Sequence, residues 1–263
     1  MSNSTVSADI HSTAIVAEDV QLGERVVIGP YTIIEEDVRI GDGTMIESHV
    51  RVGRGARFGR DCRIHHCAAV GAAPQDLKYA GERTELFVGD RTTIREFATV
   101  HRGTTHSGKT VVGSDCLIMS YAHVAHDCRI GNHVILANAV NLAGHVTIED
   151  WVSVGGVVPV HQFVRLGAHC FIGGGFRVPQ DVVPYALAAG YPLRVVDINR
   201  IGLERRGFTA EQLDALSRAF RILFRSKLNT TQALERIRTD VARTAEVLRL
   251  IEFIESSERG ITA

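Results

Sequence analysis

The sequence predicts a mainly β protein, in which a parallel β-helix of hexapeptide repeats is followed by a small C-terminal α-helical domain. Three observations indicate this fold class. An apolar residue recurs at nearly every sixth position from Ile10 to Val178, glycine often follows that residue, and the six-residue period ends at about Tyr185. We therefore expect the β-helix over residues 1–184 and the helical domain over residues 185–263.

The six-residue ladder of apolar side chains determines the first domain. Steps of six from Ile10 to Val178 reach 29 positions, of which 26 are apolar, whereas a hydrophobic content of 45% would give about 13. Six residues suit one short strand and a bend, and three strands close a coil of 18 residues. Stacked coils place parallel strands about 4.8 Å apart, with the ladder inside. We expect the glycines that follow the ladder, such as Gly23 and Gly41, to relieve backbone strain at the turns.

Three polar residues interrupt the ladder, and they mark two excursions. Asp76 and Glu82 fall within residues 73–85, and His106 falls within residues 102–110. Loops that leave a rigid scaffold commonly carry binding groups. We expect both excursions to be loops that contribute to a functional site.

The segment after Tyr185 predicts three amphipathic helices. The first covers residues 209–226, with Thr209 as its N-cap and apolar residues at helical spacing. The other two cover residues 230–243 and 244–257, where apolar residues recur at the same spacing. Arg218, Arg221 and Arg225 lie at i, i+3 and i+7 of the first helix, which places them on one side. This basic side is a candidate docking surface for an acidic protein partner, and a solvated helix face is the alternative.

Composition excludes several classes of partner. The net charge of −1 gives no overall field that favours nucleic acid or an anionic membrane. No stretch approaches the roughly 20 apolar residues of a membrane span, and residues 1–9 lack an apolar signal core. We expect a soluble cytoplasmic protein. Four of its five cysteines share one apolar slot of the repeat, where we expect them to be buried and reduced.

Histidines and amides gather in columns, because residues 18 apart lie on adjacent coils. His126, Gly144 and Gln162 form one column, and Asp127 and His145 begin the next. His123 and Asn141 form a third, and His161 is adjacent to Gln162. The spacing therefore predicts a patch of imidazoles and amides along one edge of the prism.

Such a patch suits proton transfer to or from a substrate hydroxyl. A neutral imidazole is an effective general base near pH 7, and a neighbouring carboxylate supports its charged form. Asp127 follows His126 directly, but whether the two side chains meet depends on the turn. The backbone N–H of Gly144 is a candidate oxyanion donor. No serine elbow is present, so the pattern favours direct transfer over a covalent acyl-enzyme.

Six motifs resemble the UDP-N-acetylglucosamine O-acyltransferases of lipid A synthesis. They are AHVAHDCRIGN (122–132), NLAGHVTIED (141–150), VHQFVRLGAH (160–169), NRIGLERRGF (199–208), APQDLKY (73–79) and VHRGT (100–104). The resemblance covers nearly the whole chain. It implies left-handed coils, a homotrimer, and transfer of a 3-hydroxyacyl chain from acyl carrier protein to the 3-hydroxyl of UDP-N-acetylglucosamine. It implies no metal and no cofactor, since the acyl carrier protein thioester is a co-substrate.

The resemblance also assigns roles to individual residues. His126 corresponds to the general base, Asp127 to its support and Gly144 to the oxyanion donor. Positions that contact the sugar nucleotide or the acyl chain correspond to Gln75, Asp76, Lys78, His101, His123, His145, His161 and Gln162. Asn199, Arg205 and Arg206 match the segment that meets the nucleotide phosphates, to which arginine is well suited. Gly174 matches the position that limits acyl-chain length, and Phe171 is the next candidate for that role.

The chain departs from the family pattern at Tyr191, where asparagine is frequent, and at Ile201, where an acidic residue occurs. These departures concern the uridine contacts rather than the chemistry. A 3-amino sugar nucleotide is an alternative acceptor.

Three alternatives use the same coil. The related N-acyltransferase carries an additional N-terminal domain, for which a repeat that begins at Ile10 leaves no room. A γ-type carbonic anhydrase would bind zinc through three histidines, for which His101, His123 and His126 are candidates, with ligands at about 2.0–2.1 Å. That family lacks the N-x-x-G-L-x-R-R-G segment found at 199–207. A non-catalytic trimeric scaffold is the third alternative.

Overall fold

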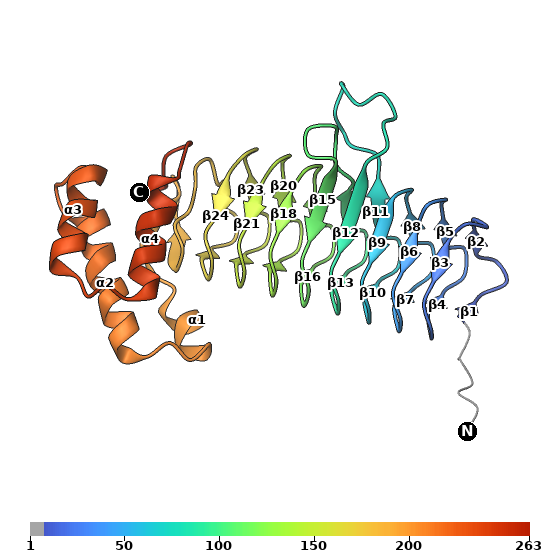
Figure 1. Cartoon of the computed structure of the whole chain (residues 1–263), viewed down its shortest axis with the longest axis horizontal. Coiled ribbons are helices and arrows are strands. Elements are labelled where there is room, and N and C mark those ends of the chain that lie inside the picture. The colour runs from blue at the N-terminus through green and yellow to red at the C-terminus, as the bar shows by residue number, and fades with distance from the viewer. Residues whose placement is uncertain (1–7) are drawn as a thin grey trace.

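The computed structural model describes residues 8–263, which form an elongated prism with helices packed at one end (Figure 1). Each turn of the prism contributes one short strand to each of three sheets, which we call A, B and C. Sheets B and C are entirely parallel, and His123 lies opposite Asn141 in sheet B. This is the register that the six-residue ladder predicts.

The strands of each sheet follow one another along the prism. Sheet A contains β1 (Asp9–Ile10), β4 (Val27–Ile28), β7 (Met45–Ile46), β10 (Arg63–Ile64), β13 (Thr93–Ile94), β16 (Leu117–Ile118), β19 (Ile135–Leu136), β22 (Ser153–Val154), β25 (Phe171–Ile172), β26 (Ala186–Ala189) and β27 (Arg194–Ile198). Sheet B contains β2 (Ile15–Val16), β5 (Ile33–Ile34), β8 (Arg51–Val52), β11 (Ala69–Ala72), β14 (Thr99–His101), β17 (His123–Val124), β20 (Asn141–Leu142) and β23 (Pro159–Val160). Sheet C contains β3 (Gln21–Leu22), β6 (Arg39–Ile40), β9 (Ala56–Phe58), β12 (Glu85–Val88), β15 (Lys109–Val112), β18 (Arg129–Ile130), β21 (Thr147–Ile148) and β24 (Arg165–Leu166).

The ladder residues fill the interior of the prism. Ile64, Ile118 and Leu142 are among those that are fully buried. Cys62, Cys116, Cys128 and Cys170 occupy the second inward slot and are buried and unpaired, as expected. Apolar burial along the prism axis therefore holds the coils together.

The explanation predicted for the glycines that follow the ladder holds at Gly71, which has a positive φ, but is wrong for most of them. Most of the residues with left-handed φ in the prism lie three positions after the ladder, and most of these carry side chains, as Asp127 and His145 do. Gly23 and Gly41 do not adopt positive φ. A Cβ on Gly41 would lie 2.5 Å from the carbonyl oxygen of Gly59 on the next coil. Glycine is needed there because adjacent coils approach closely.

Both excursions are loops that leave the middle of the prism (Figure 1). The first connects β11 to β12 and the second connects β14 to β15, so both pass from sheet B to sheet C. We call the place where the chain turns from sheet B to sheet C the B/C edge, and name the A/B and C/A edges in the same way.

Two strands and one short helix, none of them expected, precede the first expected helix. Residues 186–198 form β26 and β27, which extend sheet A before the chain enters α1 (Arg200–Arg205). The other helices are α2 (Ala210–Arg225), α3 (Thr230–Asp240) and α4 (Ala245–Glu255). Thr209 caps α2 in a capping box with Gln212, as its sequence predicts.

After α4 the chain returns to the prism and forms what we call the strap, residues 257–262. Ile261 bridges to Asp181 beside the last coils, and the amide of Thr262 donates to the carbonyl of Asp181 at 2.7 Å. Within residues 8–263, no helix has the length and apolar character needed to cross a membrane.

Candidate active site at the B/C edge

The B/C edge collects the residues of the predicted column. His126, Gly144 and Gln162 each lie in the turn that leads from a strand of sheet B to the next strand of sheet C. Because both excursion loops leave the prism at this edge, they add their side chains to the same place. The column expected from the 18-residue spacing is therefore present, with two loops beside it.

His126 and Asp127 form a hydrogen-bonded pair. His126 Nδ1 lies 2.7 Å from Asp127 Oδ2, with the imidazole mostly buried and the carboxylate side chain fully buried. The left-handed φ of Asp127 at the turn turns its side chain toward its neighbour, which the alternation of a regular strand would prevent. The pair therefore leaves Nε2 of His126 as the ring nitrogen available to a substrate.

The second excursion loop surrounds the Asp127 carboxylate with donors. Thr104 Oγ1 donates at 2.7 Å, the Thr104 amide donates to both oxygens, and the Ser107 hydroxyl donates to Oδ1. Burial raises the pKa of Asp127, but the hydrogen bonds from Ser107, Thr104 and His126 outweigh it and hold that pKa at about 2. The carboxylate is therefore ionised at neutral pH and fixed in orientation.

Gly144 lies directly against the imidazole of His126. A Cβ at position 144 would approach Cε1 of His126 to 2.6 Å and Nε2 to 2.9 Å. Within residues 8–263 the amide of Gly144 makes no hydrogen bond. The site thus offers an unpaired backbone N–H beside a general-base nitrogen.

Two further pairs of histidines flank the dyad. His101 and His123 meet edge to face with ring centroids 4.8 Å apart, and Thr99 Oγ1 lies 2.7 Å from His123 Nδ1. Burial, together with the charges of His123 and His126, lowers the pKa of His101 to about 4. Burial also lowers the pKa of His123. These two rings are therefore neutral at pH 7.

The second pair is His145 and His106. His145 stacks on Phe163 at 4.4 Å and contacts His106 at 4.7 Å between ring centroids. Burial lowers the pKa of His145, and the charge of Asp127 opposes this shift. His106 belongs to the second loop, so the coil spacing gave no signal for its place in the site.

The carboxylate of Asp127 argues against a metal centre at this edge. His126, Asp127 and His145 offer ligand atoms within 4.8 Å of one another. Both oxygens of Asp127, however, already accept hydrogen bonds from Thr104 and Ser107. A cation would have to displace these donors, so the residues fit a hydrogen-bonded dyad better than a metal site.

The first loop holds Gln75, Asp76 and Lys78. Gln75 and Lys78 are exposed, and the charge of Asp76 acts on His145, so the loop reaches the column. Arg102 fixes the loop by donating to the Gly71 carbonyl at 2.9 Å and to the Tyr79 hydroxyl at 2.7 Å. His161 and Gln162 extend the site one coil beyond Gly144.

The remaining predicted residues lie away from the B/C edge. A cavity of about 600 Å³ lies on the outer face of sheet A, and its lining includes Asn199, Arg205 and Arg206. Phe171 also lines it, as does Ile201, one of the two positions at which this chain departs from the family pattern. Asn199 caps α1, and Arg206 lies over the Trp151 ring at 5.2 Å. Gly174 follows β25 at the A/B edge. Within one subunit, the residues predicted to bind the nucleotide and to limit acyl-chain length therefore lie away from His126.

Sequence comparisons match residues 109–144 to a family described as bacterial transferase hexapeptide (six repeats), and residues 181–262 to one described as UDP N-acetylglucosamine O-acyltransferase, domain 2. The acyl-[acyl-carrier-protein]–UDP-N-acetylglucosamine O-acyltransferase of Myxococcus xanthus is 51% identical, over 97% of this chain and 99% of its own. That of Chlorobaculum parvum is 57% identical, over 96% of both.

A solved structure agrees with these relatives. The UDP-N-acetylglucosamine acyltransferase of Francisella novicida superposes with a TM-score of 0.93 at 38% identity, over 96% of this chain and 93% of that one. The expected fold class, a left-handed parallel β-helix with a small helical domain, is confirmed. The chain therefore belongs to the acyl-[acyl-carrier-protein]–UDP-N-acetylglucosamine O-acyltransferase family and is an acyltransferase.

Proposed function

We propose that the chain transfers a 3-hydroxyacyl group from an acyl carrier protein thioester to the 3-hydroxyl of UDP-N-acetylglucosamine, the first step of lipid A synthesis. The names of the relatives supply the donor and the acceptor. The observation that carries the mechanism is the arrangement of Asp127, His126 and Gly144, which places a carboxylate, an imidazole and a free N–H in sequence.

In this mechanism Nε2 of His126 takes the proton of the sugar hydroxyl as its oxygen attacks the thioester carbonyl. The ionised Asp127 stabilises the imidazolium, and the Gly144 N–H stabilises the oxyanion. The carbon–sulfur bond then breaks, and the imidazolium returns its proton to the leaving thiolate. No other described group at this edge is needed for the proton transfers.

The cysteines support transfer without an acyl-enzyme. Burial raises the pKa of Cys62 and Cys116 to about 11 and that of Cys128 to about 12. Only the thiolate is a good nucleophile, so these thiols are inert at neutral pH. The inertness of these three thiols favours direct attack by the sugar hydroxyl.

Mass spectrometry of products tests the proposed reaction. The enzyme is offered UDP-N-acetylglucosamine or its 3-amino analogue, with acyl carrier protein thioesters of several lengths, both 3-hydroxylated and unsubstituted. We expect an ester at the sugar 3-oxygen from a 3-hydroxyacyl donor. Exclusive acylation of the amino analogue, or of no sugar, would contradict the proposal.

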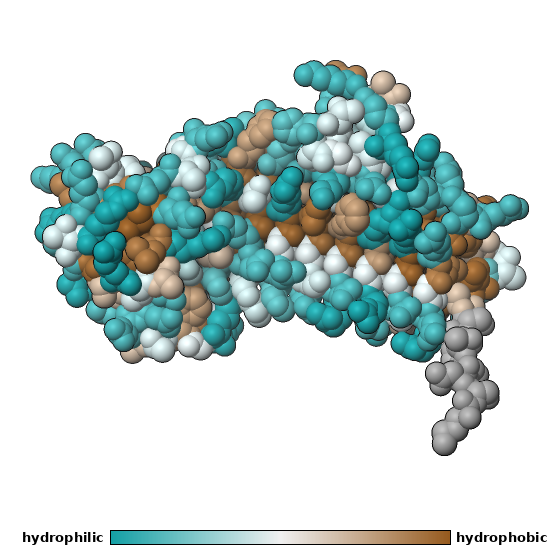
Figure 2. All heavy atoms as spheres, viewed as in Figure 1, coloured by the Kyte–Doolittle hydropathy of each residue, from teal (hydrophilic) through white to brown (hydrophobic). Residues whose placement is uncertain are grey.

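We further propose a homotrimer with sites between subunits. The predicted residues occupy different edges of one prism, so a neighbouring copy has to complete each site. Exposed apolar side chains support a packing surface around the A/B edge: Ile15, Tyr31, Ile33, Met45, Phe97, Tyr121, Ile135, Val157 and Phe171. Figure 2 shows hydrophobic residues in a stripe along the prism, between hydrophilic ones.

Mixed trimers should reveal shared sites. If His126 and Arg205 of one site come from different subunits, random mixing of His126→Ala and Arg205→Ala chains leaves about a quarter of the sites with both native residues. We expect mixing, after dissociation and reassembly, to restore activity that neither variant has alone. Light scattering should report a trimer; a fully active monomer, or no gain on mixing, would contradict the shared site.

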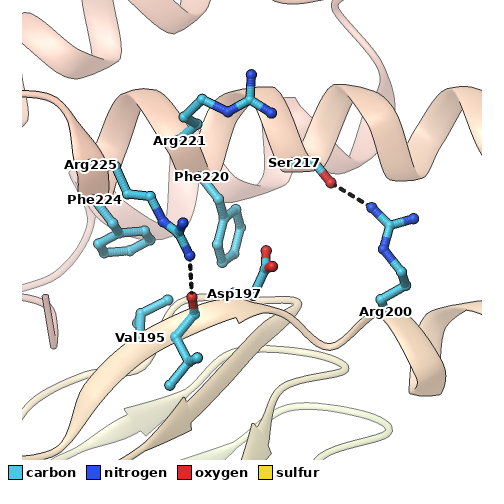
Figure 3. A pocket seen from close by; sticks show the side chains of 9 residues that line it. Val195, Asp197, Arg200, Ser217, Phe220, Arg221, Phe224 and Arg225 are labelled. Atoms are coloured by element: carbon cyan, nitrogen blue, oxygen red, sulfur yellow. Dashed lines mark hydrogen bonds between the residues drawn. The ribbon is translucent and has the colours of Figure 1, made fainter.

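The basic side of α2 remains the proposed docking surface for acyl carrier protein. Arg218, Arg221 and Arg225 are all exposed. Arg221 and Arg225 are among the residues that line a small pocket between α2 and β27; Figure 3 shows Arg225 pointing down toward β27 and Arg221 pointing away from it. Arg225 donates to the Val196 carbonyl at 2.9 Å, which holds its guanidinium at the rim.

Reversing this charge should weaken donor binding selectively. We expect glutamate at all three positions to raise KM for the acyl carrier protein substrate about tenfold or more, with a smaller effect at high salt. KM for the sugar nucleotide should change little. A charge-matched control replaces three other exposed arginines, Arg236, Arg238 and Arg243, by glutamate. Equal increases in KM for the acyl carrier protein substrate in both triple variants would contradict a docking role.

Gly174 is the proposed stop for the acyl chain. Its Cβ position is 3.2 Å from the carbonyl of Gly156, so a side chain fits after a small shift and projects from the A/B edge. We expect Gly174→Met to favour shorter donors, by about fourfold for each CH₂ no longer buried. Competition between thioesters of different length measures this. Phe171→Ala is the comparison variant. If the preference for acyl-chain length changes in Phe171→Ala and not in Gly174→Met, the residue that limits chain length is Phe171.

A further inference from the structure

The strap is anchored to the prism through Asp181, a buried acidic residue. One carboxylate oxygen of Asp181 accepts the Ser257 hydroxyl at 2.8 Å, and the other accepts the Arg165 amide at 2.8 Å. The Asp181 amide donates to the Gly260 carbonyl at 3.2 Å. Since Asp181 is only 1% exposed, these bonds are shielded from water. The strap therefore holds its side chains in fixed positions.

The anchored strap places Arg259 against His161. Arg259 Nη2 lies 3.2 Å from His161 Nδ1 and donates to the Pro179 carbonyl at 3.3 Å. The two residues are 98 positions apart, so neither the repeat nor the coil spacing predicts their contact. His161 is adjacent to Gln162, one coil beyond the Gly144 amide.

This contact determines which nitrogen of His161 carries the proton. A guanidinium has only donors and stays protonated in proteins, so Nδ1 must act as the acceptor. The Gln162 carbonyl also lies 3.2 Å from Nδ1, but a proton placed there would point at the positive charge of Arg259. The single ring proton therefore belongs on Nε2. Within residues 8–263 this nitrogen makes no hydrogen bond, so it is available as a donor.

We propose that Arg259 is a positioning residue that directs the ring proton of His161 to Nε2, so that this imidazole donates a hydrogen bond to bound substrate. The strap thereby ties the end of the helical region to one specific ring of the active site. The substrate contact of His161 rests on the proposed function, whereas its tautomer does not.

Ring-nitrogen chemical shifts test the tautomer in the intact protein. With ¹⁵N-labelled histidine, we expect Nδ1 of His161 to show the shift of an unprotonated nitrogen, assigned by comparison with His161→Asn. In Arg259→Met a form with the proton on Nδ1 should become populated. Without the guanidinium charge, Nδ1–H of His161 can donate to the Gln162 carbonyl. Arg259→Lys retains a charged donor and should keep the native form. A protonated Nδ1 in the unaltered protein would overturn the proposal.

Kinetics give the second readout. We expect Arg259→Met to raise KM for UDP-N-acetylglucosamine about three- to tenfold, the usual effect of one misdirected hydrogen bond, with kcat nearly unchanged. Arg238→Met removes an exposed arginine that pairs with Glu255 and serves as the matched control. The signals of the other histidines show whether the fold is intact.

The two readouts separate the two claims. If His161→Ala has native kinetics, the proposed substrate contact of His161 fails, and the ring-nitrogen shifts still decide the role of Arg259. If Arg259→Met leaves both the shifts and KM unchanged, Arg259 does not position His161.

Discussion

Replacement of His126 by alanine is expected to reduce kcat by about 10²–10⁴-fold, the usual contribution of a general base. The variant loses the imidazole that is hydrogen-bonded to the Asp127 carboxylate and lies against Gly144. Its fold should persist, because His126 lies in a turn outside the apolar ladder that fills the prism. Steady-state rates and thermal unfolding of the purified variant measure both quantities.

A second histidine provides the control. His133 stacks on Trp151 with ring centroids 3.9 Å apart, at the C/A edge, so His133→Ala removes an imidazole without touching the B/C edge. We expect nearly native turnover for this variant. Native turnover of His126→Ala itself would show that the proton is taken by another group.

Replacement of Asp127 by asparagine is expected to lower kcat by about 10²-fold or more, because a neutral amide cannot stabilise the imidazolium. The change also affects folding. An amide group presents N–H donors to Thr104 and Ser107, which are themselves donors, so some of these contacts are lost. We expect a loss of stability on the order of 2 kcal/mol at pH 7.

The pH dependence of this loss follows from the lowered pKa. Asp127 binds its proton less readily when folded, with a pKa of about 2, than when unfolded, near 3.8. Its contribution is therefore complete above about pH 4 and disappears as pH falls toward 2. Unfolding curves of the native protein and Asp127→Asn should converge over that range. Asp115→Asn alters an exposed pair with Arg91 and should leave activity intact; similar losses in both variants would refute a special role for Asp127.

Periodicity predicted most of the fold, because a repeat that fills its own interior leaves little choice of architecture. The same spacing predicted that His126 and Gly144 would be neighbours, which holds to within contact distance. The contact between the His126 and Asp127 side chains could not be predicted from the spacing. It depends on the left-handed φ of Asp127 at the turn, which is unusual for a residue that carries a side chain. Sequence gave no reason to expect that conformation at Asp127.

Some contacts made by irregular segments were not predicted. Thr104 and Ser107 reach Asp127 from a loop whose path has no period, and Arg259 reaches His161 from the strap. β26 and β27 were missed because residues 186–198 no longer follow the ladder. The turn glycines were misread because their constraint comes from the next coil, which is invisible in a local sequence window.

The two ends of the prism differ in how they can fray. β1, β2 and β3 each pair with a strand on one side only within the described residues, whereas the other end is covered by β26, β27, the helices and the strap. Each coil contacts only its neighbours, so opening spreads coil by coil from the uncovered end. Several intact coils separate that end from β17 and β20, which insulates the geometry around His126 from the least stable part of the molecule.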